Sequence, residues 1–518
     1  MTTLNKSPLT NWKIIDLFKG DSQKYAVDAM PYVLSIVTML YLYIELGDGQ
    51  LFNEDYAVYL QQAWNIANHV PMREMGVIHS FDPSRPLLLQ GPLTYPPLLP
   101  LIYAVPVSVF GFNVQVFKTI QLGITLAGLL VFCYAMRKWR FIAIETTSSI
   151  LIFALSYEVR RSVNTIGSDL PFILFLVISL LAIDCFVNST RSKKYGWGIL
   201  SGTAIFLAID LRTVGVALLP TLWIADFLAH RRLKLVSTAM PMIIISALWI
   251  GQRVLGLSGG DYGFILNYRF FTPVENSQEF YWAFVQPLTN SAFPTLGIII
   301  FLVLAVMAAI GVLYEAARGM TVAVFILVYT ALLLVLPNFN AGARYLVPQL
   351  LVLGAFAVRG TTVVGQLAGV GVRARQVLTW GTAVLGLVWC ILIPSPLPSG
   401  HWNFGVTSGS AREIFAYIRE QTPTDALVAA SKFRSFHLFT QRTTICPPEF
   451  GTLAEMMAWL HDHSVSYVVV KYSPPRWNYD LTDCPGLPLC HADRLEPGTS
   501  ELFRNSDFVL FRVSVDNG

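Results

Sequence analysis

The chain has 518 residues, of which 54% are hydrophobic and only 13% are charged, and its mean hydropathy is +0.55. Soluble domains carry about twice that charged fraction, and a single soluble core stops growing at about 250–300 residues, so the composition excludes an ordinary soluble protein. The formal net charge of +4 gives no electrostatic support for a nucleic-acid partner. The sequence therefore predicts an α-helical, multi-pass integral membrane protein.

The N-terminal part predicts one span followed by a large loop. Residues 1–28 are polar and contain four lysines, and the first apolar segment is Ala29–Leu46. No short apolar stretch with a small-residue cleavage site precedes that segment, so we expect an uncleaved first span. The loop covers 47–114 and is mostly polar. Its apolar part, Pro96–Val109, contains four prolines, which disfavour a regular spanning helix, and we interpret it as an interfacial or re-entrant piece.

Ten further apolar segments bring the prediction to about 11 spans. They lie near residues 115–136, 142–157, 170–187, 196–211, 214–229, 235–255, 291–314, 320–336, 345–358 and 376–394. The loops on the side of the N-terminus are short and basic, whereas the opposite loops are mostly long and mixed in charge. The basic loops are 137–140, 191–194, 231–234, 318 and 359–375. This alternation predicts a cytoplasmic N-terminus, and counting Pro96–Val109 as a span would invert every later loop.

The last segment, residues 397–518, has the composition of a soluble domain, whereas residues 29–396 form the membrane domain. The segment predicts a small α/β domain, which the loop alternation places outside the cytoplasm. Cys484 and Cys490 could form a local disulfide if this domain faces an oxidising compartment. Its expected helices are Ala411–Glu420 and Thr452–His463, and its expected strands are Ala426–Ala430, Tyr467–Lys471 and Phe508–Val513.

An acidic stretch, Phe52–Tyr59, lies directly after the first span, at the predicted outer surface. Small and apolar residues recur after it at helical spacing, so an interfacial helix is expected to follow. Asp55 would begin that helix, where it could either cap the helix or face a cavity. Capping is the commoner role for a carboxylate at such a position.

A second carboxylate, Asp169, precedes a span on the same outer side, and Pro171 in the first turn would also fit a simple helix cap. Arg160 and Arg161 lie earlier in the same loop. Positive charge beside the outer ends of spans runs against the usual bias, so these two arginines suggest that an anion is held there.

Arg212 separates two short apolar runs. A charge at membrane depth is costly and often marks a function, although Asp210 could simply pair with this arginine. Arg269 and Arg344 add two more outer cations. Three or more converging cations would form a phosphate or pyrophosphate clamp. The sequence contains no glycine-rich phosphate loop with lysine and no histidines at metal-ligand spacing, so neither a cofactor nor a metal is expected.

In their order along the chain, these residues resemble the glycosyltransferase C (GT-C) superfamily, over roughly residues 29–360 in layout. The most similar branch contains protein O-mannosyltransferases and lipid A aminoarabinose transferases. That branch carries Asp-Glu-x-x-Tyr in the first outer loop. Here Asp55-Tyr56-Ala57-Val58-Tyr59 keeps the aspartate and the final tyrosine, and Glu54 precedes them. The branch's Lys-Pro-Pro-Leu becomes Tyr95-Pro96-Pro97-Leu98, without the lysine, and Gly167–Pro171 resembles its second acidic motif.

The resemblance implies a polyprenyl-phosphate-linked sugar donor, a lipid, glycan or protein acceptor, and inversion at the sugar carbon, in a bacterial inner or plasma membrane. Asp55 is then the expected acceptor base, with Asp169 as a second catalytic candidate. The expected ligands of the donor phosphate are Arg160, Arg161, Arg212, Arg269 and Arg344. The further site candidates are Glu54, Tyr59, Tyr95 and Tyr345.

Two other functions stay open at this stage. A transporter or flippase for a lipid-linked or amphipathic solute would share polar residues at membrane depth. It would not need a long, acidic first outer loop, and the hydropathy of the two halves shows no inverted repeat. A membrane-anchored receptor whose tail binds a ligand would leave the outer aspartates and arginines unexplained.

Overall fold

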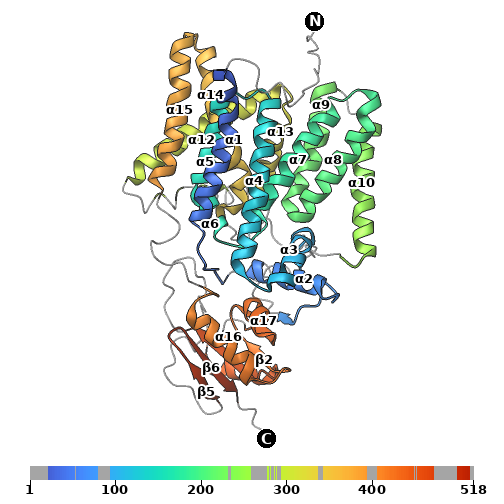
Figure 1. The fold of residues 1–518 in the computed structure, drawn as a ribbon, viewed down its shortest axis with the longest axis vertical. Helices are drawn as coiled ribbons and strands as arrows, with labels where there is room; N and C mark the ends of the chain where they lie inside the picture. Colours follow the sequence, from blue (N-terminus) through green and yellow to red (C-terminus); the bar gives the residue numbers. More distant parts are fainter. Residues whose placement is uncertain are drawn as a thin grey trace.

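A computed structural model gives the arrangement of the chain in two parts, a helical bundle and a smaller α/β domain at one end of it (Figure 1). It describes residues 22–52, 54–79, 94–231, 235–257, 293–335, 342–393, 405–447, 452–471 and 499–513, with Phe450 and a few positions between 277 and 288. Helix α1 begins at the end of the bundle that lies away from the α/β domain (Figure 1).

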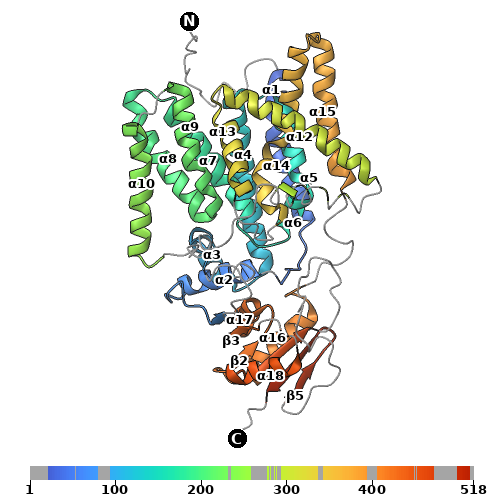
Figure 2. The ribbon, with the colours of Figure 1, turned by 180° about the vertical axis from the view of Figure 1, so that it is seen from behind.

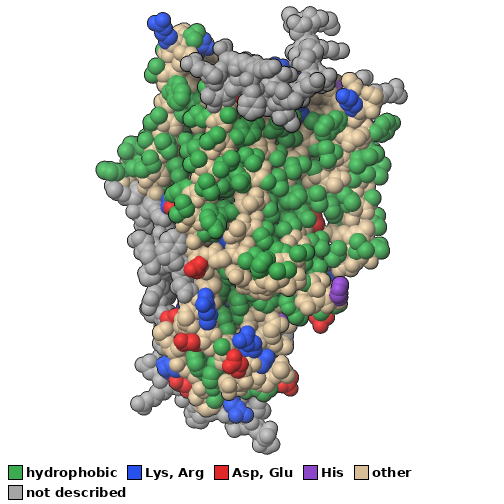
Figure 3. All heavy atoms as spheres, viewed as in Figure 1, with side chains coloured by type: hydrophobic (Ala, Val, Ile, Leu, Met, Phe, Trp, Pro, Cys, Tyr) green, Lys and Arg blue, Asp and Glu red, His purple; other side chains and the backbone are tan. Residues whose placement is uncertain are grey.

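Each of the predicted spans coincides with a helix. The helices are α1 Ser22–Ile44, α4 Val114–Lys138, α5 Ala143–Leu155, α7 Asp169–Val187, α8 Arg191–Leu211, α9 Leu218–His230, α10 Leu235–Val254, α12 Pro294–Ala317, α13 Thr321–Val335, α14 Val347–Leu367 and α15 Val372–Leu392. Within the described ranges, seven helical segments are long and apolar enough to cross a membrane. Hydrophobic side chains cover the visible flank of the bundle, whereas charged ones gather at its ends (Figure 3). The chain is an integral membrane protein, and the number of 11 spans stays a prediction.

Helices α12 and α14 touch through their backbones. A Cβ atom at Gly311 would collide with the carbonyl of Phe356, and one at Gly360 would collide with the carbonyl of Met307. Small residues at such crossings let membrane helices approach closely, where van der Waals contact stabilises the pair. These two glycines therefore fix how α14 lies against α12. The short 3₁₀ helix η5 (Gly342–Leu346), which carries Arg344, directly precedes α14.

Two short helices, α2 (Glu54–Ala67) and α3 (Leu98–Phe110), lie between the bundle and the α/β domain (Figures 1 and 2). The proline-rich piece is thus helical: Pro97 is its N-cap, Pro100 lies in the first turn and only Pro106 is well inside. Prolines at a helix start cost little because the N–H groups there have no intrahelical partner. With 13 residues, α3 is shorter than the roughly 20 that a span needs.

The α/β domain contains one six-stranded sheet with the order β1-β3-β2-β4-β6-β5. The three predicted strands and two predicted helices are confirmed. Strands β1, β3 and β5 and helix α17 were not predicted from the sequence. The elements are β1 Val77–His79, β2 Leu427–Ala429, β3 Thr443–Cys446, β4 Tyr467–Lys471, β5 Thr499–Arg504 and β6 Phe508–Val513, with α16 Gly409–Gln421, α17 Phe433–Thr440 and α18 Leu453–Asp462. Cys484 and Cys490 lie outside the described residues.

Strand β1 comes from the loop after α1, not from the C-terminal segment. It pairs in parallel with β3, and Val77 lies opposite Thr444. The sheet is therefore built from two parts of the chain that the sequence analysis had assigned to different domains. This shared sheet ties the loop that carries Asp55 to the C-terminal domain.

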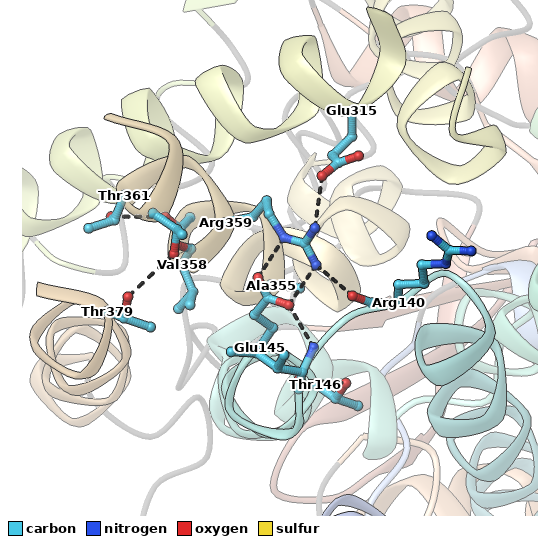
Figure 4. Close-up of polar contacts among 12 residues, drawn as sticks. Arg140, Glu145, Thr146, Glu315, Ala355, Val358, Arg359, Thr361 and Thr379 are labelled. Carbon is cyan, nitrogen blue, oxygen red and sulfur yellow. Dashed lines mark hydrogen bonds and ion pairs between the residues drawn. The ribbon is translucent and has the colours of Figure 1, made fainter. Parts of the chain in front are cut away.

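A charge cluster holds α5, α12 and α14 together (Figure 4). Arg359 donates to Glu145 at 2.6 and 2.8 Å and to Glu315 at 2.8 Å. It also donates to the carbonyl of Arg140 at 3.0 Å. The predicted basic loop over 359–375 is wrong at its start, because α14 continues to Leu367 and includes Arg359. Two glutamates neutralise the arginine, so the helix can bury it.

Candidate active site

Asp55 lies in the first turn of α2, and side chains from two distant segments hold its carboxylate. Its Oδ1 accepts a hydrogen bond of 2.6 Å from the hydroxyl of Tyr95, just before α3. Its Oδ2 accepts one of 2.6 Å from Arg344, which belongs to the 3₁₀ helix η5 (Gly342–Leu346). The side chain of Asp55 keeps 22% of its surface exposed. The carboxylate is therefore held in place and remains accessible.

The surroundings of Asp55 favour its ionised form. Burial alone would raise the pKa of this carboxyl, but the Arg344 guanidinium and the Tyr95 hydroxyl outweigh burial and hold the pKa below its ordinary value. The guanidinium of Arg434, in α17 of the C-terminal domain, acts in the same direction. Asp55 is thus a carboxylate at neutral pH and can accept a proton.

Asp169, the first residue of α7, forms an ion pair with Arg212. Arg212 ends α8 and precedes the 3₁₀ helix η3 (Thr213–Ala217). The alternative pairing of Arg212 with Asp210 is not observed, because Asp210 accepts a hydrogen bond of 2.6 Å from Gln252. Both members of the Asp169 pair are largely buried, with 13% and 9% of their side chains exposed.

Tyr345 lies between the two arginines. The guanidinium of Arg212 is 4.6 Å from the centre of its ring, and that of Arg344 is 5.7 Å away. Cations are attracted to the faces of aromatic rings within about 6 Å. The ring therefore joins the Asp55 pair to the Asp169 pair in one cluster.

Tyr59 links the same two pairs from the side of α2. Its hydroxyl lies 3.2 Å from the Oγ of Ser168, the N-cap of α7, and its ring centre is 4.6 Å from that of Tyr95. Burial, followed by the charge of Asp55, raises the pKa of Tyr59, so this phenol stays neutral and serves as a hydrogen-bonding group. The structure thus brings together Asp55, Asp169, Arg212, Arg344, Tyr59, Tyr95 and Tyr345.

The other predicted phosphate ligands have different partners. Arg160 donates two hydrogen bonds, of 3.0 and 3.1 Å, to Glu45 at the end of α1. Arg161 lies 3.8 Å from Glu158, within the short helix α6 (Tyr157–Val163). Arg269 lies outside the described residues, as does the side chain of Glu54, which begins α2.

Glu158 is a carboxylate near the site that the sequence analysis did not select. Burial raises its pKa, and the charges of Arg161 and Arg344 oppose the rise. The sequence gives a weak signal for it, since it stands two residues before a pair of arginines. Among the described residues, no group of three or more potential ligand side chains could hold a metal ion.

No protein-family model matches this sequence, and no curated protein matches it. Solved structures do match it. ArnT from Cupriavidus metallidurans, bound to undecaprenyl phosphate, aligns with a TM-score of 0.54 and 14% identity over 95% of this chain and 98% of that chain. The oligosaccharyltransferase AglB from Archaeoglobus fulgidus, in complex with an inhibitory peptide and a dolichol-phosphate, aligns with a TM-score of 0.52 and 12% identity over 87% and 70%.

The arabinofuranosyltransferase AftD from Mycobacteria aligns with a TM-score of 0.53 and 12% identity, over 94% of this chain but 41% of that chain. All three neighbours are GT-C glycosyltransferases, and the chain has the GT-C fold. The predicted fold class, a membrane helical bundle with a small C-terminal α/β domain, is confirmed.

Proposed function

We propose that this chain is a membrane glycosyltransferase that moves a sugar from a polyprenyl-phosphate donor to an acceptor hydroxyl, with inversion and with Asp55 as the acceptor base. One observation carries the proposal: in a GT-C fold, the ionised and partly exposed Asp55 lies in one cluster with two arginines. Undecaprenyl phosphate and dolichol-phosphate, which are bound in the ArnT and AglB structures, support the class of donor.

Asp55 supplies the base. A carboxylate has about four lone-pair positions, so one of its oxygens can receive a proton while Tyr95 and Arg344 stay bonded. The acceptor hydroxyl gives its proton to Asp55 and attacks the anomeric carbon. The bond from that carbon to the phosphate oxygen breaks, and its electron pair leaves with the lipid phosphate. Because one displacement occurs, the configuration at the carbon inverts.

Arg212 and Arg344 stabilise the leaving group. Charge develops on the phosphate oxygen as the bond breaks, and fixed cations in a site with little water stabilise that charge strongly. Both guanidiniums lie against Tyr345, and each now neutralises a carboxylate. A donor phosphate near Tyr345 would compete with the carboxylates for these arginines.

That competition has a useful consequence for Asp55. When Arg344 turns toward the phosphate, the carboxylate loses the partner that does most to keep its pKa low. Its pKa then rises, and Asp55 becomes a stronger base only when a donor is bound.

The test is a comparison of Asp55→Asn with Asp48→Asn in the purified protein. Asp48 is an exposed aspartate of the same loop and is bonded to Gln115, so it serves as a matched control. The assay follows release of undecaprenyl phosphate from a panel of undecaprenyl-phosphate-linked pentoses and hexoses, with membrane extract as the acceptor. Asp55→Asn should lower turnover by about 10²–10⁴-fold, the usual contribution of a general base. Asp48→Asn should leave turnover unchanged.

Binding of undecaprenyl phosphate separates this role from a structural one. In Asp55→Asn the affinity for the lipid phosphate should be unchanged or higher, because Arg344 is released from its partner. If Asp55 were only a helix cap, asparagine would replace it with little cost and turnover would stay at the wild-type level. That result would refute the proposed role of Asp55.

A further inference from the structure

The C-terminal domain holds the segment around Asp55 at three positions. Before α2, the carbonyl of Gln50 accepts a hydrogen bond of 2.9 Å from the N–H of Val406. Phe52 is 3% exposed and packs into the C-terminal domain. In α2 itself, the hydroxyl of Tyr56 donates a hydrogen bond of 3.0 Å to Ser435 of α17. The contacts lie on both sides of Asp55.

Phe52 is the hydrophobic part of this attachment. Its ring centre lies 5.9–6.3 Å from those of three phenylalanines of the C-terminal domain, namely Phe415, Phe436 and Phe508. Aromatic rings at such separations pack favourably, and burying them removes a large apolar area from water. The start of α2 is therefore fixed to the C-terminal domain.

Arg434 stands next to Ser435 in α17, and it is almost fully buried, with 1% of its surface exposed. A buried guanidinium is costly unless an opposite charge compensates it. The charge of Arg434 acts on Asp55, and its guanidinium lies 5.4 Å from the ring centre of Phe433. The neighbouring contact of Tyr56 with Ser435 places this part of α17 against the first turn of α2.

We propose that Arg434 is a positioning residue of the Asp55 site, so that the C-terminal domain completes the site through α17. This inference rests on the proposed function of Asp55 as the base. When Arg344 turns toward the donor phosphate, Asp55 needs a second cation to stay oriented toward the acceptor. Arg434 comes from a different domain and does not depend on the donor, so it can supply that charge throughout the reaction.

The test compares Arg434→Met, which removes the charge, with Arg434→Lys, which keeps it. Arg434→Met should lower kcat by about 10–100-fold, the effect of a misplaced reacting group, with little change in the KM of the donor. Arg434→Lys should recover most of the loss. The matched control is Arg442→Met, since Arg442 is also buried but donates within its own domain, to the carbonyls of Thr422 at 2.9 Å and Thr440 at 3.3 Å.

The pH profile distinguishes positioning from general support of the fold. The groups that bond or act electrostatically on Asp55 are Arg344, Arg434 and the phenols of Tyr59 and Tyr95. None of them changes charge between pH 3 and pH 7, since their ordinary pKa values are about 10 or higher. Glu158 does titrate near Arg344, so the profiles are measured in a Glu158→Gln background. The decrease of kcat at low pH, where Asp55 takes up a proton, is the acid limb of the profile. It should move to higher pH in Arg434→Met and stay in place in Arg442→Met.

Wild-type kcat and an unmoved acid limb in Arg434→Met would overturn the inference, as would a lysine variant no better than methionine. If Arg434→Met does not fold, Tyr56→Phe removes only the hydroxyl that bonds Ser435. It should lower kcat several-fold at an unchanged melting temperature, and wild-type kcat would again overturn the inference. Failure of the proposed function looks different, because Asp55→Asn itself would then be fully active.

Discussion

Arg344 donates a 2.6 Å hydrogen bond to Asp55 across 289 positions of the sequence. The second ion pair, Arg212 with Asp169, has the same arrangement of elements as the pair of Arg344 with Asp55. In both pairs the carboxylate lies in the first turn of a helix, α2 or α7, and the arginine lies in or directly before a 3₁₀ helix. The 3₁₀ helices η3 and η5 lead directly into α9 and α14, so each arginine lies just before a helix of the bundle and not in the middle of a span.

Removal of the Arg344 charge should weaken both donor binding and turnover. We expect Arg344→Met to lower kcat by about 10²–10³-fold, as loss of one donor to a developing anion does. Undecaprenyl phosphate should also bind more weakly, which separates this variant from Asp55→Asn. Arg161→Met is the control, since that side chain is 36% exposed and belongs to the Glu158 pair. Equal affinity for the lipid phosphate in Arg344→Met and wild type would argue against the phosphate role.

The Tyr95 hydroxyl should matter through its bond to Asp55. Hydrogen bonds to charged groups contribute about 1.5–3 kcal/mol, so Tyr95→Phe should lower kcat by roughly 10-fold or more and raise the pKa of Asp55. Tyr103→Phe is the matched control in the adjacent helix, because its buried hydroxyl has no hydrogen-bond partner within the described part of the chain. Kinetics at several pH values measure both effects. Equal losses in the two variants would assign the effect to packing alone.

His437 should make the attachment of the loop after α1 sensitive to acid. Its Nε2 accepts a 3.3 Å hydrogen bond from the N–H of Gly76, and its Nδ1 lies 2.8 Å from the carbonyl of Arg442. These partners require a neutral ring with the proton on Nδ1. Burial lowers the pKa of His437 below its ordinary value, so the unfolded chain takes up the proton first as pH falls.

The free energy of unfolding should therefore be highest above about pH 6.5 and should decrease as pH falls from there toward the lowered pKa of the folded state. His437→Gln should remove this part of the pH dependence. Thermal unfolding of the intact protein in detergent from pH 5 to pH 8 measures it. His463→Gln is the control, because His463 is exposed in the same domain. Parallel pH curves for wild type and His437→Gln would rule out this contribution.

The Arg359 cluster should stabilise the bundle and take no part in transfer. Arg359→Met leaves Glu145 and Glu315 buried without their cation, which should cost about 3–5 kcal/mol. Replacing both glutamates by glutamine in the same variant should restore much of that stability. Arg137→Met is the control, since its pair with Asp28 is 50% and 35% exposed and should contribute little. Melting temperatures in detergent decide between these expectations.

The basic loops predict that the C-terminal domain is outside the cytoplasm. A reporter that is active only in the cytoplasm should be silent when fused after Gly518 and active when inserted after Arg318. The proposed site lies at the same end of the bundle as the C-terminal domain, so this experiment also decides on which face transfer occurs. Activity after Gly518 would place the site on the cytoplasmic face and contradict the predicted topology.

The sequence predicts the helices of the bundle well, because a membrane requires long apolar segments that stand out from the loops. It also selects seven residues that the structure brings together, because charges near span ends are unusual and because Asp55, Tyr59 and Tyr95 lie in stretches that resemble GT-C motifs. The sequence alone could not show which of these residues contact one another. The bond from Asp55 to Arg344 and the approach of Arg434 depend on packing between distant segments, and hydropathy carries no information about such packing.

The missed strands have a similar cause. Strand β1 has three residues and β3 contains two threonines, so neither shows the alternation that marks a strand alone. Each is stabilised by its neighbour in the sheet. The error at Arg359 also follows from a pairing: an arginine at a span end indicates a loop unless its two glutamate partners are known.

The shared sheet also sets an order of events during synthesis. The loop that carries Asp55 and β1 emerges early from the ribosome, whereas its partners are made much later, with 361 positions between Gly76 and His437. Until then Phe52 has no aromatic partners to pack against, and the edge of β1 is unpaired. We therefore expect the loop after α1 to remain without its sheet partner and its aromatic contacts until the segment up to β3 has been synthesised.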